Sequence, residues 1–291
     1  MNIQHIPVML KEVTEMLRPQ HDGIYVDATV GLGGHAEGIL QYAHGCTLIG
    51  IDRDETALEI ARERLSKYIN VHLVSDNFSN MKKVVNSFGV TKVNGILLDT
   101  GVSTLHLKSE GRGFSFLKDE PLDMRMNKNQ ELSAQEVVNK YSEKDLAAII
   151  WQYGEERFSR KIARAIVQAR KKKPITSCKE LSEIIEKTVR GRGRIHPATR
   201  TFQAIRIEVN KELEELSAAV EAGAELLQTG ARFCVLSYHS LEDRIIKNAF
   251  KKLAKDGLFN IITRKPLVPS REEQRSNPSS RSAKFRVGEK I

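Results

Sequence analysis

Cysteine and long apolar runs are scarce in this sequence. Its 291 residues include three cysteines, Cys46, Cys178 and Cys234, an odd number that lie far apart. This spacing argues against a disulfide framework and against a cysteine-bound metal, so we expect three reduced, buried thiols and no metal site. No run approaches the roughly 18 apolar residues that a membrane span needs. We therefore expect a globular protein without a membrane segment.

The first residues also lack the marks of a targeting signal. Residues 1–19 contain no apolar h-region and no Arg- and Ser-rich transit composition, so we expect a cytoplasmic location. A hydrophobic content of 40% is enough for a sizeable core. The length favours one large domain with an insertion, or two domains.

Acidic residues are outnumbered, and unevenly so. The chain has 46 Lys and Arg against 37 Asp and Glu, a net charge of +9. Residues 140–200 hold 16 basic and 7 acidic residues, and residues 261–291 hold 8 and 3. Basic runs of this kind often lie on solvent-exposed faces of helices and bind no partner. Here the runs at 170–173 and 190–194 are expected at loops or helix ends, where they are available to phosphates.

Residues 24–35 read Ile-Tyr-Val-Asp-Ala-Thr-Val-Gly-Leu-Gly-Gly-His, the pattern of a strand, a tight turn and a helix N-terminus. The glycines of this turn let a ligand approach the backbone, and the helix offers unpaired N–H groups. A second apolar strand, 46–51, precedes Asp52, whose carboxylate suits the hydroxyls of a ribose. The pattern Gly31-x-Gly33-x-x-Ala36 also fits a dinucleotide fingerprint, so the turn alone does not separate a nicotinamide from S-adenosylmethionine.

Residues at the ends of the predicted strands favour S-adenosylmethionine over a nicotinamide as the cofactor. Asp27 ends the first strand, where it can hold the turn or reach a cationic amino-acid group. The residues Asp76-Asn77-Phe78 follow a strand at 71–74 and suit the edge and face of an adenine. Asp99 follows a nearly continuous apolar strand at 93–98. Three carboxylates at the carboxyl ends of strands favour a ligand site there.

The βα rhythm stops after residue 103. Helical patterns follow at 134–141, 143–153, 157–172 and 178–190, and then a helix at 199–227, a strand at 232–236 and a helix at 241–253. The tail at 266–282 reads as loop, with a short strand at 284–287. We predict an α/β fold, a Rossmann-like class I methyltransferase sheet with an inserted all-helical domain. The sheet domain spans residues 1–105 and 198–291, and the insert spans 106–197.

Several blocks resemble one known family along nearly the whole chain. They are His5-Ile-Pro-Val, Val26-Asp-Ala-Thr, Gly33-Gly-His35, Ile51-Asp-Arg-Asp54, Arg112-Gly-Phe-Ser-Phe116, Pro121-Leu-Asp-Met-Arg-Met126, Tyr153-Gly-Glu-Glu156, Pro197-Ala-Thr-Arg-Thr-Phe-Gln203, His239-Ser-Leu-Glu-Asp-Arg244 and Arg281-Ser-Ala-Lys284. Together they resemble the methyltransferase H family of the bacterial small ribosomal subunit, the MraW family. The resemblance implies methyl transfer from S-adenosylmethionine to N4 of a cytidine in 16S rRNA, with the rRNA or small ribosomal subunit as partner.

The resemblance also implies a set of cofactor contacts, which fall on Gly33, Gly34, His35, Asp52, Phe78 and Asp99. A further family contact is a glutamine at the position of His106. This chain reads Ser103-Thr-Leu-His106 where the family usually reads Ser-Ser-Pro-Gln. A paralogue with another RNA target, or a non-catalytic RNA-binding role, therefore stays open, and a nicotinamide-dependent oxidoreductase is a further alternative.

Methylation of an exocyclic amine such as N4 requires hydrogen-bond acceptors for the amine more than it requires a strong base. The Asn-Pro-Pro-Tyr and Asp-Pro-Pro-Tyr motifs of DNA amino-methyltransferases are absent after the fourth strand. Asp99 and His239 are the catalytic candidates, and a structural hydrogen bond explains His239 equally well. A flipped base needs an aromatic ring on which to stack. The RNA-binding candidates are Arg112, Phe114, Lys171, Lys172, Arg192 and Arg194.

Overall fold

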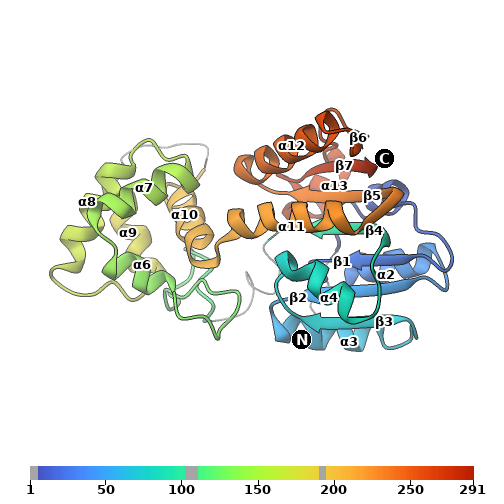
Figure 1. Ribbon diagram of the computed structural model, residues 1–291. Coiled ribbons are helices and arrows are strands. Elements are labelled where there is room, and N and C mark those ends of the chain that lie inside the picture. Colours follow the sequence, from blue (N-terminus) through green and yellow to red (C-terminus); the bar gives the residue numbers. More distant parts are fainter. Residues whose placement is uncertain (1–5, 102–110, 190–194) are drawn as a thin grey trace. The chain divides into compact units, whose positions relative to one another are not determined.

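The computed structural model describes residues 6–101, 111–189 and 195–291, and the chain forms two units (Figure 1). The sheet unit comprises residues 1–101 and 213–291, and the helical unit comprises residues 102–212. Among the described residues, no helix combines the length and the apolar character needed to cross a membrane.

The sheet unit contains a seven-stranded sheet in the order β3-β2-β1-β4-β5-β7-β6. Its first five strands run parallel to their neighbours, and β7 runs antiparallel to both β5 and β6. The strands are β1 (Ile24–Asp27), β2 (Thr47–Asp52), β3 (Val71–Ser75), β4 (Val93–Asp99), β5 (Leu227–Ser237), β6 (Phe259–Ile261) and β7 (Lys284–Lys290).

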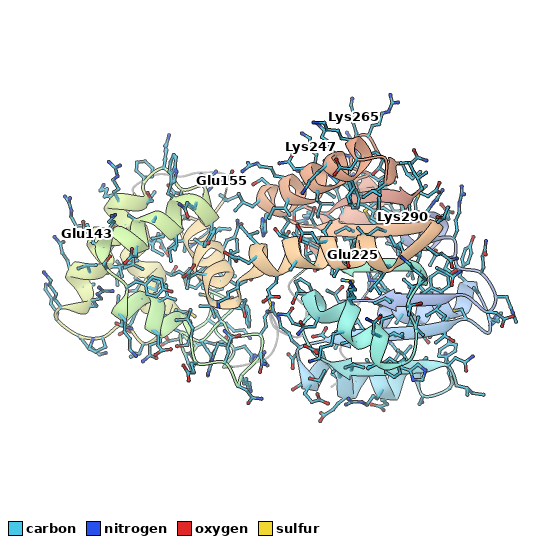
Figure 2. All side chains as sticks on the ribbon, in the orientation of Figure 1. Glu143, Glu155, Glu225, Lys247, Lys265 and Lys290 are labelled. Atoms are coloured by element: carbon cyan, nitrogen blue, oxygen red, sulfur yellow. The ribbon has the colours of Figure 1, made fainter. Side chains whose placement is uncertain are left out.

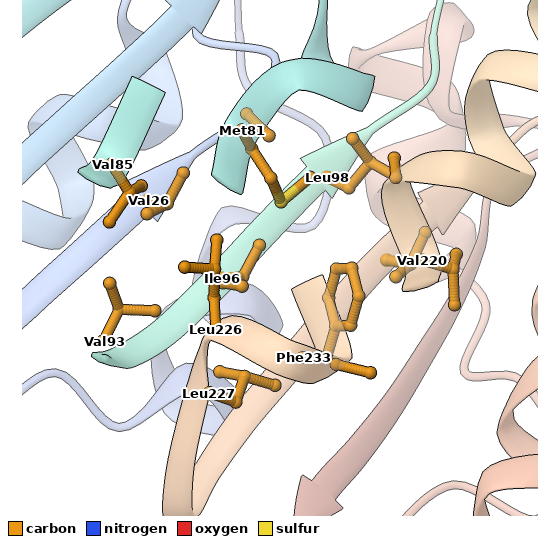
Figure 3. Packing of buried hydrophobic residues seen from close by; sticks show 14 of the residues in the cluster. Val26, Met81, Val85, Val93, Ile96, Leu98, Val220, Leu226, Leu227 and Phe233 are labelled. Atoms are coloured by element: carbon orange, nitrogen blue, oxygen red, sulfur yellow. The ribbon is translucent and has the colours of Figure 1, made fainter. Parts of the chain in front are cut away.

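Successive strand residues enter two different cores. Val26, Ile96 and Phe233 pack into a cluster with α4, α11 and α12 (Figure 3). Tyr25, Leu97 and Cys234 pack into a second cluster with α1, α2 and α3. Apolar residues on both faces explain why these strands read as continuous apolar runs. The helices are α1 (Leu10–Leu17), α2 (Gly34–Tyr42), α3 (Glu55–Leu65), α4 (Met81–Ser87), α11 (Glu212–Leu226), α12 (Ser240–Lys255) and α13 (Arg271–Ser276), with 3-10 turns η1 (Phe78–Asn80) and η2 (Pro278–Ser280).

The helical unit packs its helices around a core of its own. Ser133 and Ser177 begin two of these helices with reciprocal capping boxes, in which each serine accepts a backbone N–H and a glutamate three residues later reaches back. The helices are α6 (Ala134–Lys140), α7 (Glu143–Gly154), α8 (Ser159–Arg170), α9 (Cys178–Thr188) and α10 (Thr199–Asn210).

The structure corrects the single helix expected at 199–227. Lys211 has φ of 49°, a left-handed conformation that ends α10, and α11 begins at the next residue. Phe202 and Ile205 of α10 lie in the core of the helical unit. The unit boundary therefore falls after Glu212, not at residue 197.

The C-terminal part is also more regular than expected. The tail contains α13 and η2, and the final strand continues to Lys290. The short strand β6 was not predicted. All three cysteines are buried and unpaired, as expected.

Candidate active site

Three carboxylates meet one edge of the sheet. Asp27, Asp52 and Asp99 are the last residues of β1, β2 and β4. The three strands are parallel and adjacent in the order β2-β1-β4, so their carboxyl ends lie at the same edge. The structure thus confirms the strand ends that the sequence predicts. This is the edge at which open α/β sheets bind ligands.

The glycine turn leads from β1 into a helix whose N-terminus carries no side-chain cap. Gly31 has φ of 50° and Gly33, the N-cap of α2, has φ of 79°, values that favour glycine. Because the N-cap is a glycine, it supplies no side-chain capping bond to the first turn of α2. Its N–H groups and the positive end of the helix dipole are therefore suited to a carboxylate of a ligand.

Hydrogen bonds of the Asp52 carboxylate connect this turn to the end of β2. Its Oδ2 accepts the N–H of Gly31 at 2.8 Å, and its Oδ1 accepts the N–H of Asp54 at 2.9 Å. A carboxylate oxygen has more than one lone pair, so both oxygens can accept a further bond from a ribose hydroxyl. The residue expected to hold the ribose thus also fixes the backbone of the turn.

Asp27 is buried with one oxygen unsatisfied. Its Oδ1 accepts the N–H of Thr29 at 3.2 Å, so it holds the turn, while its Oδ2 has no hydrogen-bond partner among the described residues. Burial, followed by the nearby charges of Asp99 and Asp52, raises the Asp27 pKa to about 8, although the Thr29 bond opposes the shift. A cationic group placed at Oδ2 would satisfy the atom and favour the ionised form.

Asp99 contacts residues from three parts of the sheet unit. The Tyr238 hydroxyl interacts electrostatically with the Asp99 carboxylate, and Asp99 Oδ1 accepts the N–H of Gly101 at 3.2 Å. Burial, and then the charge of Asp99, raises the pKa of Tyr238 well above its ordinary value, so the phenol keeps its proton. A Cβ at Gly101 would lie 2.8 Å from the Tyr238 ring, and therefore glycine is needed there.

His35 approaches Asp99 from the first turn of α2. Its Nε2 lies 2.9 Å from the carbonyl oxygen of Val8. A carbonyl only accepts, so Nε2 carries the proton and Nδ1 faces Asp99 Oδ2 at 3.7 Å. The contact with Val8 fixes the ring of this buried side chain.

Polar and aromatic groups follow β3, where an adenine was expected. Phe78 is partly buried against the core beneath it. Asp76 Oδ1 accepts bonds from Asn77 N and Asn80 Nδ2, both at 2.7 Å. Asn77 Oδ1 is buried and has no hydrogen-bond partner in the part of the chain that the structure describes. This oxygen is an acceptor suited to the exocyclic amine of adenine. The sequence had led us to expect that the neighbouring acid, Asp76, would contact the adenine edge.

His239 has a structural place as the N-cap of α12. Its Nδ1 accepts the N–H of Glu242 at 3.4 Å, and Glu242 Oε2 in return accepts the N–H of His239 at 3.2 Å and of Tyr238 at 2.8 Å. This capping box holds Tyr238 beside Asp99. Sequence reasoning missed Glu242, although an acid three residues after the cap is the signal of such a box.

The RNA-binding candidates of the helical unit fall into three groups. Arg112 is 6% exposed and donates to the carbonyls of Arg125 and Met126, and its role in RNA binding stays a prediction. Phe114 packs against the core. Lys171 and Lys172 are exposed just after α8. Arg192, Arg194, the cofactor candidate His106 and the first residue of the block at 5–8, His5, lie outside the described residues.

Comparison with known proteins decides the family. The sequence matches the MraW methylase family over residues 2–291. This chain belongs to the MraW methylase family. The protein is thus a methyltransferase whose methyl donor is S-adenosylmethionine, and the nicotinamide-dependent oxidoreductase is excluded.

Relatives of this MraW methylase are similar over their full length. A protein of Caldicellulosiruptor saccharolyticus is 48% identical over 99% of both chains, and one of Clostridium botulinum is 47% identical over 100% of both. Both are named "Ribosomal RNA small subunit methyltransferase H". A solved structure from Clostridium thermocellum, described as a putative rRNA-methylase, covers 99% of this chain at 13% identity with a TM-score of 0.50, which supports the fold alone.

The residues at the sheet edge fit the cofactor of this MraW methylase. The unsatisfied Asp27 Oδ2 suits its ammonium group, the uncapped N-terminus of α2 suits its carboxylate, and the unsatisfied Asn77 Oδ1 suits the adenine amine. Donors and acceptors thus match a molecule that carries an amino acid at one end and an adenine at the other.

Proposed function

We propose that this MraW methylase transfers a methyl group to N4 of a cytidine in small-subunit (16S) rRNA. Two relatives with identities of 48% and 47% over at least 99% of this chain carry the rRNA methyltransferase name. The observation that carries the proposal is Asp99, an acceptor fixed by Tyr238 and Gly101 at the ligand-binding edge of the sheet. A target amine needs such an acceptor.

We assign the two functions to the two units. In the sheet unit the cofactor contacts are Gly33, Gly34, His35, Asp52, Phe78 and Asp99. The helical unit, which holds the whole basic segment 140–200, recognises RNA. An rRNA substrate also places the protein in the cytoplasm.

Asp99 meets the chemical need of the reaction. The N4 lone pair of cytidine is delocalised into the ring, so the amine must be aligned and its N–H bonds accepted while nitrogen becomes tetrahedral. When bound, S-adenosylmethionine supplies an electrophilic methyl group. Asp99 accepts an N4–H bond and then takes the proton or passes it to solvent. Tyr238 and Gly101 keep the carboxylate in place during this change, so the chain supplies orientation and a proton acceptor.

Tritiated methyl transfer to purified small-subunit RNA and to immature subunits tests the proposal. Asp99→Asn keeps the shape but replaces one acceptor oxygen by an NH₂ donor, and we expect kcat to fall about 100-fold or more. Asp22→Asn is the matched control, because Asp22 is exposed before β1, at the opposite edge of the sheet.

The same assay separates the remaining alternatives. Label on N4 of a cytidine supports the proposal, and label on another base or in another RNA contradicts it. Binding of both S-adenosylmethionine and RNA without transfer would instead support the non-catalytic paralogue.

A further inference from the structure

A groove on the helical unit is formed by α7 and α8. It encloses about 840 Å³, and its wall includes Trp151, the only tryptophan of the chain. Trp151 is 58% exposed. Other residues of α7, Leu146, Ile149 and Ile150, are the ones that pack into the core of the unit. Folding of α7 therefore does not require an indole at this position.

The groove is also strongly basic. One acidic residue, Glu143, lines it, against five basic residues, Lys144, Arg157, Arg160, Lys161 and Arg164. Figure 2 labels Glu143 at the start of α7. Arg164 pairs with Glu143 at 3.4 Å, and Arg157 covers the ring of Phe158 at 4.6 Å. Within the described ranges, Lys144, Arg160 and Lys161 form no ion pair with a carboxylate. Their charges are directed to solvent and are not neutralised by the fold.

We propose that this groove binds a single-stranded segment of RNA, with one base stacked on Trp151 and its phosphates held by Lys144, Arg160 and Lys161. The inference rests on the proposed rRNA substrate and names the surface that holds it. Exposed aromatic rings beside cations are the combination that binds single strands, because each base has a π-face and each nucleotide has a charge. An acidic peptide would satisfy the charges but would leave the indole without a planar partner.

The tryptophan itself reports on binding. Because Trp151 is the only tryptophan, stacking of a base should quench the intrinsic fluorescence of the protein directly. The probe is a 5′-labelled oligouridylate of about 12 nucleotides, a length within the range that single-strand sites cover. We expect quenching that saturates together with the anisotropy of the label. Polyglutamate tests the acidic peptide, and we expect it to cause no quenching.

Substitutions separate stacking from charge. Trp151→Ala should weaken oligouridylate binding roughly ten-fold, and Trp151→Phe should remain within about three-fold of the parent. The double variant Arg160→Ala/Lys161→Ala should flatten the log-log salt slope by about 1.4, since each single-strand phosphate contact contributes about 0.7. Lys251→Ala/Lys255→Ala is the matched control. These two exposed lysines lie near the end of α12, a helix that starts after the ligand-binding edge and leads away from it.

The outcomes distinguish this inference from the proposed function. Unchanged oligouridylate affinity in Trp151→Ala, or equal salt slopes in the two double variants, overturns the groove assignment. Tight polyglutamate binding that Trp151→Ala leaves intact also overturns it. If the parent methylates small-subunit RNA while these results appear, the proposed function stands and only the groove fails. If the groove binds RNA but the parent transfers no methyl group, the proposed function fails instead.

Discussion

At the scale of single residues, Asp27 links the cofactor site to pH. The folded protein holds a proton on this carboxyl up to about pH 8. The unfolded chain loses that proton near the ordinary aspartate pKa of about 3.9. The folded state thus binds more protons between these values, so stability without cofactor should fall as pH rises, by at most about 1.4 kcal/mol per pH unit. Asp27→Asn should remove this contribution, which urea unfolding between about pH 5 and pH 8 measures.

Cofactor binding provides the control for Asp27. If the ammonium group of S-adenosylmethionine lies at Asp27 Oδ2, binding near neutral pH should release a proton, visible by calorimetry in two buffers of different ionisation enthalpy. Asp27→Asn should bind with less proton release. Equal proton release and equal pH slopes in both proteins would contradict this role.

Single residues also mark the limit of sequence reasoning at this site. Asp27, Asp52 and Asp99 were predictable because each follows a short apolar strand, and parallel strands bring their carboxyl ends together. The interaction of Asp99 with Tyr238 was not predictable, because the two residues are distant in sequence and meet only through the pairing of β4 with β5. The unsatisfied Asn77 oxygen is likewise a product of burial, which no pattern of residue types encodes.

At the scale of elements, the positions of strands were easier to predict than the points at which helices end. The parallel strands β1 to β4 lie within one or two residues of their expected ranges. Strands β1, β2 and β4 are largely buried on both faces, which gives each a nearly continuous apolar run, whereas β3 is only partly buried. The break between α10 and α11 was missed because Lys211, unlike glycine or proline, gives no signal of a left-handed conformation. The strand β6 is too short, at 3 residues, to show a period.

The start of α12 gives a test of the His239 assignment. Loss of an N-cap should cost about 1 kcal/mol, so His239→Ala should lower the free energy of unfolding by that amount. Asparagine is a good cap, and His239→Asn should restore most of the stability and keep kcat within a few-fold of the parent. Normal stability with a large loss of kcat in His239→Asn would show that the imidazole acts in the chemistry.

At the scale of the whole molecule, charge is concentrated in one segment. The balance of 16 basic to 7 acidic residues at 140–200 predicts that RNA affinity falls linearly with salt on a log-log plot. Replacing Lys171, Lys172, Arg192 and Arg194 by Ala should flatten that slope and leave the dissociation constant of S-adenosylmethionine unchanged. A salt titration of RNA binding and calorimetry of the cofactor check both parts, and an unchanged slope would remove these residues from the RNA surface.

The place of the helical unit in the chain has a consequence for synthesis. Strand β4 ends at Asp99, and its partner β5 pairs Leu236 with that residue, so residues 102–212 are made between the two strands. At the usual rate of roughly 5–20 residues per second, translation of this segment takes on the order of ten seconds. Throughout that time one edge of β4, with Ile96, Leu97 and Leu98, has no neighbouring strand, and the nascent chain on the ribosome exposes an apolar edge that other chains can pair with.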